Sequence, residues 1–251
     1  MMITTLAYAA ENAFYGGYGM MGFGWFDPTY SLVIIGLIIT MIASSNVNRT
    51  FKKYDKVLSR RGISGAMAAR KILDANGLHN IRVEQVSGNL TDHYSPKEGV
   101  IRLSDSTYNS TSIAALGVAA HECGHAVQHQ VGYVPIKLRN SMVPFVNICS
   151  SLSIPIILLG IILGYSNFAM FGVILYCAVL AFQVVTLPTE TNASSRAVDT
   201  LYSMAILDDD ELKGTKKVLS AAAMTYFASA ASTALQLLRL FLIVSGNRRR
   251  D

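Results

Sequence analysis

The sequence predicts a mainly α-helical integral membrane protein with a modest water-facing α+β part. Half of the 251 residues are apolar and only 15% are charged, which is not the composition of an ordinary soluble enzyme. Residues 28–48 and 140–189 carry no charged side chain. Because a helix needs about 20 apolar residues to cross a bilayer, the first stretch can supply one membrane helix and the second stretch two.

The N-terminal 28 residues contain no lysine or arginine. A cleavable secretory signal begins with basic residues before its apolar core, so this segment does not fit one. We expect residues 1–28 to form an extracytoplasmic segment, either an interfacial cap or a disordered tail. A first membrane helix follows over residues 29–48, with Trp25, Phe26 and Tyr30 as interfacial anchors.

Six basic residues follow the first predicted span, between Arg49 and Arg61. Loops rich in lysine and arginine stay on the cytoplasmic side of a membrane. We therefore expect residues 49–140 to face the cytoplasm. A second water-facing segment, residues 188–217, is expected on the same side, because the intervening hairpin crosses the membrane twice.

The first water-facing block has the pattern of a small α+β fold. A serine, apolar residues at helical spacing and a closing glycine predict a helix over residues 64–77. Alternating patterns predict strands at residues 81–88 and 100–104. Residues 99–105 fit an edge strand and a core strand equally well. A long helix is predicted from Ser112 to Val131.

The uncharged stretch that follows is long enough for a membrane hairpin over residues 141–187. We expect its spans at residues 142–164 and 168–187, joined by a short uncharged turn. Pro188 is expected to start a new helix, because proline is tolerated in the first turn of a helix.

The C-terminal segment, residues 218–251, is apolar as far as Val244 and basic at its end. We favour a helix that begins in the water-facing part and ends in or at the membrane. A fourth full span is the alternative, although it would place the basic tail outside, against the charge rule. The acidic residues 208–211 are interpreted as a solvated loop.

The strongest functional signal is AAHECGHAVQHQ, residues 119–130. His121 and His125 are four residues apart, so on a helix they share one face at about 6 Å and can bind one zinc ion. Glu122 lies toward the same side and can act as a general base on a zinc-bound water. The small residues around the motif allow other elements to approach this helix closely.

His129 lies on the same helix, but its axial rise from His121 is about 12 Å. The ligands of one tetrahedral zinc lie about 3–4 Å from each other, so we expect His129 to be a cleft or surface histidine. A later acidic residue must then complete the site. Glu190 is favoured because it stands alone where the hairpin ends, and Asp199 is the alternative.

With these motifs the chain resembles the YugP-type neutral zinc metallopeptidases. The resemblance is carried by SIAALGVAAHECGHAVQH, by LPTETNASSRA and by LRLFLIV before a basic tail, and it covers most of the chain. More distantly, the layout is similar to HtpX-type membrane peptidases and CAAX-prenyl endopeptidases. Their ExxAD motif supplies a glutamate ligand, which implies Glu190 here. Ser194 stands in place of the aspartate of that motif, which normally supports a zinc-bound histidine. The candidates for that support here are Asn192, Ser194 and Asp199.

The resemblance implies a zincin-like α+β catalytic part with a small sheet on the HExxH helix, plus three or four membrane helices. It implies a zinc metalloendopeptidase of the plasma membrane, facing the cytoplasm, with one Zn²⁺ held by His121, His125 and Glu190. Its substrate would be a peptide or membrane protein, and we expect contact with the lipid bilayer but none with nucleic acid. The alternative is a catalytically inactive zinc-binding membrane scaffold.

Peptide hydrolysis at zinc also needs a group that stabilises the tetrahedral oxyanion. Arg196, six residues past Glu190, is the first candidate for this catalytic role. Tyr226, His93 and His129 are weaker candidates.

Overall fold

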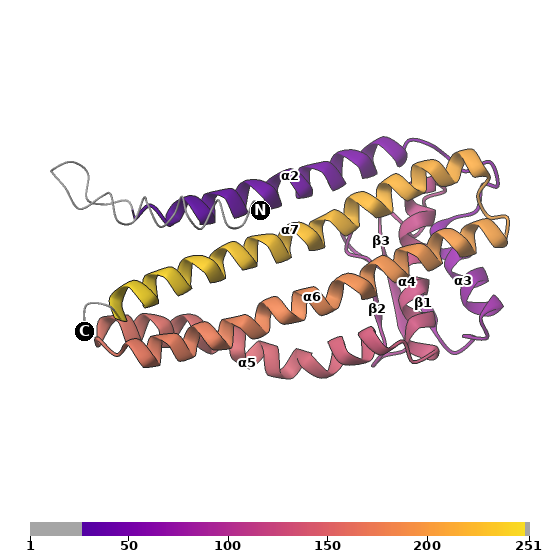
Figure 1. Ribbon diagram of the computed structural model, residues 1–251. Helices are drawn as coiled ribbons and strands as arrows, with labels where there is room; N and C mark the ends of the chain where they lie inside the picture. Colours follow the sequence, from indigo (N-terminus) through magenta and orange to yellow (C-terminus); the bar gives the residue numbers. More distant parts are fainter. Residues whose placement is uncertain (1–26, 249–251) are drawn as a thin grey trace. The chain divides into compact units, whose positions relative to one another are not determined.

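The computed structural model describes residues 27–248, which are mostly helical with one small sheet (Figure 1). Most of the predicted segment 1–28, with Trp25 and Phe26, lies outside the described residues, as does the end of the basic tail. In chain order the elements are α2 (Tyr30–Tyr54), α3 (Gly65–Ala75), β1 (Arg82–Val86), β2 (His93–Ser95), β3 (Val100–Ser104), α4 (Ile113–Gln130), α5 (Val134–Ile162), α6 (Ser166–Ser203) and α7 (Asp209–Arg248).

The chain forms two compact units. The first, here called the apolar unit, has residues 27–41, 146–180 and 228–248 as its described part. The second, the sheet unit, consists of residues 42–145 and 181–227 and contains α3, α4 and the three strands. The mainly α fold class with a small sheet is thus confirmed.

Within residues 27–248, four helices are long and apolar enough to cross a membrane, namely α2, α5, α6 and α7 as far as Gly246. The sequence predicted three or four membrane helices, and α7 is the fourth candidate. It begins at Asp209, so the acidic residues 208–211 start a helix and the loop interpretation was wrong. Glu211 is buried, and its carboxylate accepts hydrogen bonds from the backbone N–H groups of Arg60 and Asp208, as in a capping box.

The helix α6 continues through Pro188, where the sequence predicted a helix start. Proline lacks the backbone N–H that would bond to the carbonyl four residues earlier, which normally disfavours a helix interior. Here α6 packs against α4 beyond the proline, at Ala193, and tertiary packing overrides the local signal. Glu190 therefore lies inside a 38-residue helix and not in a first turn.

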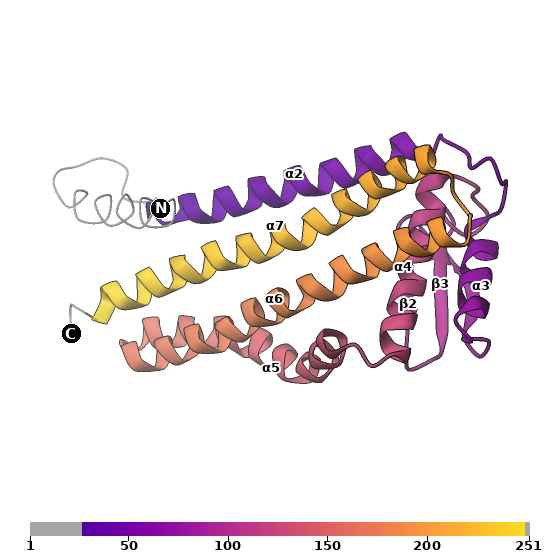
Figure 2. The same ribbon diagram turned by 45° about the vertical axis from the view of Figure 1, so that its right-hand side comes forward.

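The sheet has the strand order β1-β3-β2, and Figure 2 shows β2 and β3 in the same part of the chain as α3 and α4. The central strand β3 is parallel to β1 and antiparallel to β2. Residues 99–105 therefore contain the core strand, with Val100, Ile101 and Leu103 fully buried. The edge strand β2 is three residues long and was not predicted, because so short a strand shows no alternation.

The helices α3 and α4 pack against each other and against the sheet. Both begin where the sequence predicted, and Ser64 and Ser112 cap them by accepting hydrogen bonds from the N–H groups of Met67 and Ala115. Gly77 follows the end of α3 with a φ of 71°, a left-handed conformation that favours glycine.

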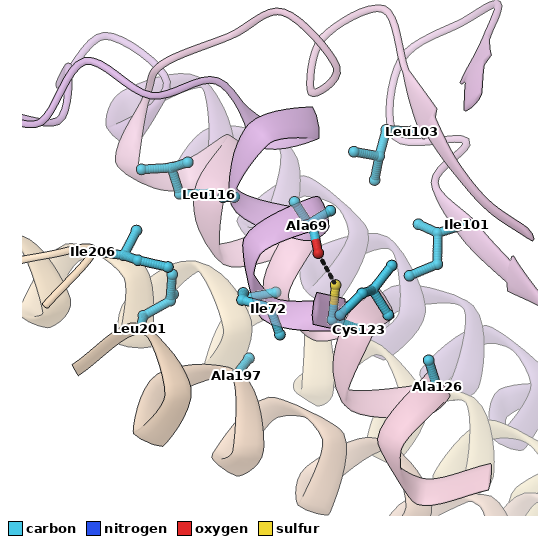
Figure 3. Packing of buried hydrophobic residues seen from close by; sticks show 14 of the residues in the cluster. Ala69, Ile72, Ile101, Leu103, Leu116, Cys123, Ala126, Ala197, Leu201 and Ile206 are labelled. Atoms are coloured by element: carbon cyan, nitrogen blue, oxygen red, sulfur yellow. Dashed lines mark hydrogen bonds between the residues drawn. The ribbon is translucent and has the colours of Figure 1, made fainter. Parts of the chain in front are cut away.

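The core of the sheet unit forms where α3, α4, α6 and β3 meet (Figure 3). Figure 3 shows Cys123 of α4 among aliphatic side chains from the other elements, and its Sγ lies 3.6 Å from the Ala69 carbonyl oxygen. Complete burial raises the pKa of the Cys123 thiol. Within HExxH, this position is therefore a packing residue rather than a metal ligand.

Helices in the apolar unit approach each other at small residues. A Cβ on Gly36 would lie 2.7 Å from Ser232 Oγ, and one on Gly160 would lie 2.4 Å from the Ala169 nitrogen. Such contacts are typical of membrane helix packing. Arg239, the charged residue within the last apolar stretch, lies over the Tyr30 ring at 4.1 Å.

Candidate metal centre

Two helices of the sheet unit bring together the three residues that the sequence singled out as ligands. His121 and His125 lie one turn apart on α4, and Glu190 lies on α6. Glu190 Oε2 is 3.4 Å from His121 Nε2 and 3.5 Å from His125 Nε2. One ligand atom from each residue lies within 4.8 Å of the others, and the two imidazole rings are nearly perpendicular, at 84°.

A glycine in the middle of the motif allows α6 to approach α4 this closely. A Cβ added at Gly124 would lie 2.7 Å from the Ala193 carbonyl oxygen and 3.2 Å from its Cα. Gly124 is one residue before His125, and Ala193 is three residues after Glu190. The backbone contact between the two helices therefore lies directly beside the proposed ligands and sets their separation.

The donor atoms fit a zinc ion. Bonds of about 2.0–2.1 Å in a tetrahedral arrangement separate two ligand atoms by about 3.3 Å, close to the two distances measured from Glu190. Glu190 is 3% exposed, and its Oε2 is buried without a hydrogen-bond partner. A buried carboxylate oxygen that faces two imidazole nitrogens is stabilised by a cation.

A buried amide fixes the orientation of His125. Gln128 Nε2 donates to the Thr189 carbonyl at 2.8 Å and to Asn192 Oδ1 at 3.0 Å. Both amide protons are then used, so Gln128 Oε1 accepts from His125 Nδ1 at 3.0 Å. The proton on Nδ1 leaves the Nε2 lone pair of His125 directed at Glu190, as a metal ligand needs.

Ser194 orients the other histidine. Its Oγ lies 3.1 Å from His121 Nδ1 and can accept the N–H proton, which leaves Nε2 of His121 unprotonated on the Glu190 side. This is the position where the ExxAD motif has an aspartate. A neutral hydroxyl replaces the carboxylate, so the support is geometric and carries no second negative charge.

The electrostatic surroundings of His125 favour a positive charge. Burial works against the charged imidazolium, but contact with Glu190 and the negative charge of Glu122 outweigh it and raise the pKa of His125 above its ordinary value. In the metal-free protein a proton therefore competes for the same nitrogen that faces Glu190.

Glu122, Tyr226 and Arg139 interact electrostatically with residues of the proposed metal site or with each other. Glu122 is 8% exposed and acts electrostatically on both His125 and Tyr226. Tyr226 of α7 also interacts with Glu190 and with Arg139 of α5. The Nε of Arg139 is buried and has no hydrogen-bond partner among the described residues.

The remaining candidates lie elsewhere in the sheet unit. Asp199 and Arg196 line a cavity of about 300 Å³ together with Cys123 and Gly124, and Asp199 is not part of the metal-binding group. Arg196 Nε donates to Asn192 Oδ1 at 2.8 Å, and its role as an oxyanion donor stays a prediction. His129 is exposed and contacts the Tyr94 ring edge-on.

Comparison with known proteins places the chain in a protein family. Residues 29–245 match the model of the family described as "Putative neutral zinc metallopeptidase". The chain belongs to this family. A relative, "Putative membrane protease YugP" of Bacillus subtilis (strain 168), is 44% identical over 217 residues, which cover 86% of this chain and 96% of the relative. No solved structure matches the chain.

Membership of this zinc metallopeptidase family confirms the resemblance seen in the sequence and implies zinc as the metal for a His–His–Glu group. The relative and the four apolar helices together indicate a membrane protein. Sequence reasoning missed Gln128 and Arg139. A glutamine three residues after a ligand histidine, on a helix of small apolar residues, is the signal that was available for Gln128.

Proposed function

We propose that the protein is a membrane-anchored zinc metalloendopeptidase whose ion is held by His121, His125 and Glu190. The observation that carries this proposal is the convergence of two Nε2 atoms on a buried carboxylate oxygen that lacks a hydrogen-bond partner. A bound zinc ion supplies Lewis acidity, which polarises a peptide carbonyl and acidifies a water molecule.

Glu122 is proposed as the general base. Its carboxylate is buried beside His125 and carries a negative charge into the site. It accepts the proton of the attacking water and passes that proton to the nitrogen of the leaving amine. A catalytic base beside a ligand histidine has no use in a purely structural metal site, which favours the enzyme over the scaffold.

Two groups are proposed to stabilise the oxyanion of the tetrahedral intermediate. The Tyr226 hydroxyl is a hydrogen-bond donor that interacts with Glu190, and Glu122 and Arg139 act on it electrostatically. Arg196 was the first candidate from the sequence. Its hydrogen bond to Asn192 supports a positioning role, because Asn192 in turn accepts from the Gln128 amide that orients His125.

The edge strand β2 is proposed to bind the substrate in an extended conformation. It pairs with β3 on one side and, within the described residues, has no strand on its other side. It also packs near the motif helix, since Tyr94 contacts His129. An extended peptide added at this edge gains main-chain hydrogen bonds regardless of its sequence. This geometry, with the sheet on the HExxH helix, supports the zincin-like assignment.

We further propose the plasma membrane as the location, with residues 49–140 and 188–217 on the cytoplasmic side. The basic residues between Arg49 and Arg61 support this orientation. Residues 29–48, 141–187 and the last helix would then contribute to the membrane part, and the substrate would be a peptide or a membrane protein rather than nucleic acid.

The replacement Glu122→Gln tests the function. It keeps the size and burial of the side chain but removes the basic carboxylate. We expect one zinc per chain in both proteins, and proteolysis of an unstructured membrane-tethered substrate only in the wild type. Asp74→Asn, at an exposed aspartate of α3, is the control that removes a carboxylate away from the site and should retain activity.

Two results would overturn this proposal. Retained proteolysis in Glu122→Gln would remove Glu122 as the base. A wild-type protein that binds zinc without an exchangeable water ligand and cleaves no substrate would establish the inactive scaffold, since a closed structural site needs a fourth protein ligand.

A further inference from the structure

A basic cavity lies in the sheet unit, away from the metal ligands. It has a volume of about 600 Å³ and opens between the end of α2 and the first half of α7. Its charged lining residues are Arg49 and Lys53 from α2 and Lys216 and Lys217 from α7. A second pocket of similar volume adjoins it, shares Arg49 and Lys53, and adds Lys52 and Lys56.

Among the described residues, no carboxylate pairs with the four cations of the cavity. No acidic residue lines the cavity, and within residues 27–248 no carboxylate lies within ion-pair distance of them. Nearby Arg60 differs, because it forms ion pairs with Asp208 and Asp210. Unbalanced cations from two helices around one concavity make a strong local positive potential.

The cavity lies where the apolar stretch of each helix begins. Arg49 is the first charged residue after the uncharged residues 28–48 on α2, and Lys217 is the last before the uncharged residues 218–238 on α7. In a membrane helix this border lies at the level of the lipid phosphates. The apolar side of the cavity is formed by Ala221 and by Met224, which is 52% exposed.

We propose that this cavity binds the headgroup of an anionic phospholipid. Arg49 and the lysines contact the phosphate, because guanidinium and ammonium groups form charge-assisted hydrogen bonds with phosphate oxygens. The hydroxyls of Thr50 and Ser220 are further donors in the lining, and the acyl chains leave along Met224. The cavity volume falls within the range of small-molecule sites, and the bound lipid ties α2 to α7.

The test measures lipid binding to the purified, zinc-loaded full chain by native mass spectrometry in detergent. We expect phosphatidylglycerol to bind at least ten times more tightly than phosphatidylcholine. The double replacement Lys216→Gln/Lys217→Gln should weaken phosphatidylglycerol binding about 30-fold, since each basic group near an anionic lipid contributes about fivefold. Lys216→Arg/Lys217→Arg should retain it.

The matched control is Lys71→Gln/Lys97→Gln, which neutralises two exposed lysines on α3 and in the β2–β3 turn and should leave lipid binding unchanged. Arg49→Gln/Lys53→Gln tests the opposite wall and should lose binding as well, so the test does not depend on one variant folding. Zinc content reports that each variant is folded.

Three results would overturn the proposal. The first is equal binding of the two lipids. The second is wild-type phosphatidylglycerol affinity in both Lys216→Gln/Lys217→Gln and Arg49→Gln/Lys53→Gln. The third is displacement of the lipid by inorganic phosphate at a concentration equal to that of the lipid, which would make the cavity a site for free phosphate.

Discussion

Replacing Gly124 by alanine should separate α4 from α6 and weaken zinc binding. The new Cβ would lie 2.7 Å from the Ala193 carbonyl oxygen. Because the obstacle is helix backbone, no side-chain rotation relieves the contact, and α6 must retreat by roughly 0.7 Å to reach the 3.4 Å of ordinary van der Waals contact. Zinc sites tolerate deviations of only about 0.2 Å in ligand distance.

The expected magnitude follows from that displacement. Glu190 moves with α6, so we expect zinc affinity to fall about 10- to 100-fold, the range found when the support of a metal ligand is lost. Overpacking costs about 1–3 kcal/mol, and alanine recovers about 0.5–1 kcal/mol of helix propensity. The metal-free protein should therefore lose at most about 2.5 kcal/mol in free energy of unfolding.

Chelator competition measures zinc affinity, and thermal unfolding in excess chelator measures the stability of the metal-free protein. Gly117→Ala is the matched control on the same helix, because its Cβ would meet the Thr215 methyl group of α7 at 2.6 Å and would not displace α6. Wild-type zinc affinity in Gly124→Ala, or an equal loss in Gly117→Ala, would refute the idea that the α4–α6 contact sets the ligand geometry.

Three further predictions concern the metal centre. When the pH is lowered, zinc affinity in chelator titrations should begin to fall before pH 6.5 is reached. The pKa of His125 is raised above this ordinary value, and zinc binds only the unprotonated ring. Zinc affinity that is constant down to pH 6.5 would contradict this prediction. Gln128→Leu should lower zinc affinity about 10-fold by leaving His125 without its acceptor, whereas the exposed neighbour Gln130 can be replaced by leucine without effect on zinc. Tyr226→Phe should reduce kcat by about 10²-fold or more with zinc content unchanged, and an unchanged kcat would remove Tyr226 as an oxyanion donor.

Much of the site was predictable because helix periodicity is a local property. Two histidines four residues apart on a capped helix must share a face, and the rise along the helix removes His129 from the ligand set. The structure brings Glu190 to these histidines and keeps Asp199 away. The two acids are nine positions apart on α6, a rise of about 13.5 Å, so one helix cannot present both to the same ion.

The parts that were missed depend on long-range contacts. Pro188 signals a helix start locally, but α6 continues through it and packs against Gly124. In the sequence, Glu211 belongs to an acidic run that looks solvated. In the fold, its carboxylate accepts a hydrogen bond from the Arg60 backbone N–H. The support of His125 by Gln128 requires acceptors on α6 that are more than 60 residues away in sequence. No local pattern encodes such partners.

The central claim is that one zinc ion is held by His121, His125 and Glu190, and zinc X-ray absorption on the purified protein tests it most directly. We predict one zinc per chain with two imidazole nitrogens at about 2.0–2.1 Å and the remaining ligands oxygen. Glu190→Ala should lower zinc content sharply, and Asp199→Ala should not. Three imidazole ligands, a sulfur ligand, or unchanged zinc content in Glu190→Ala would contradict the assignment.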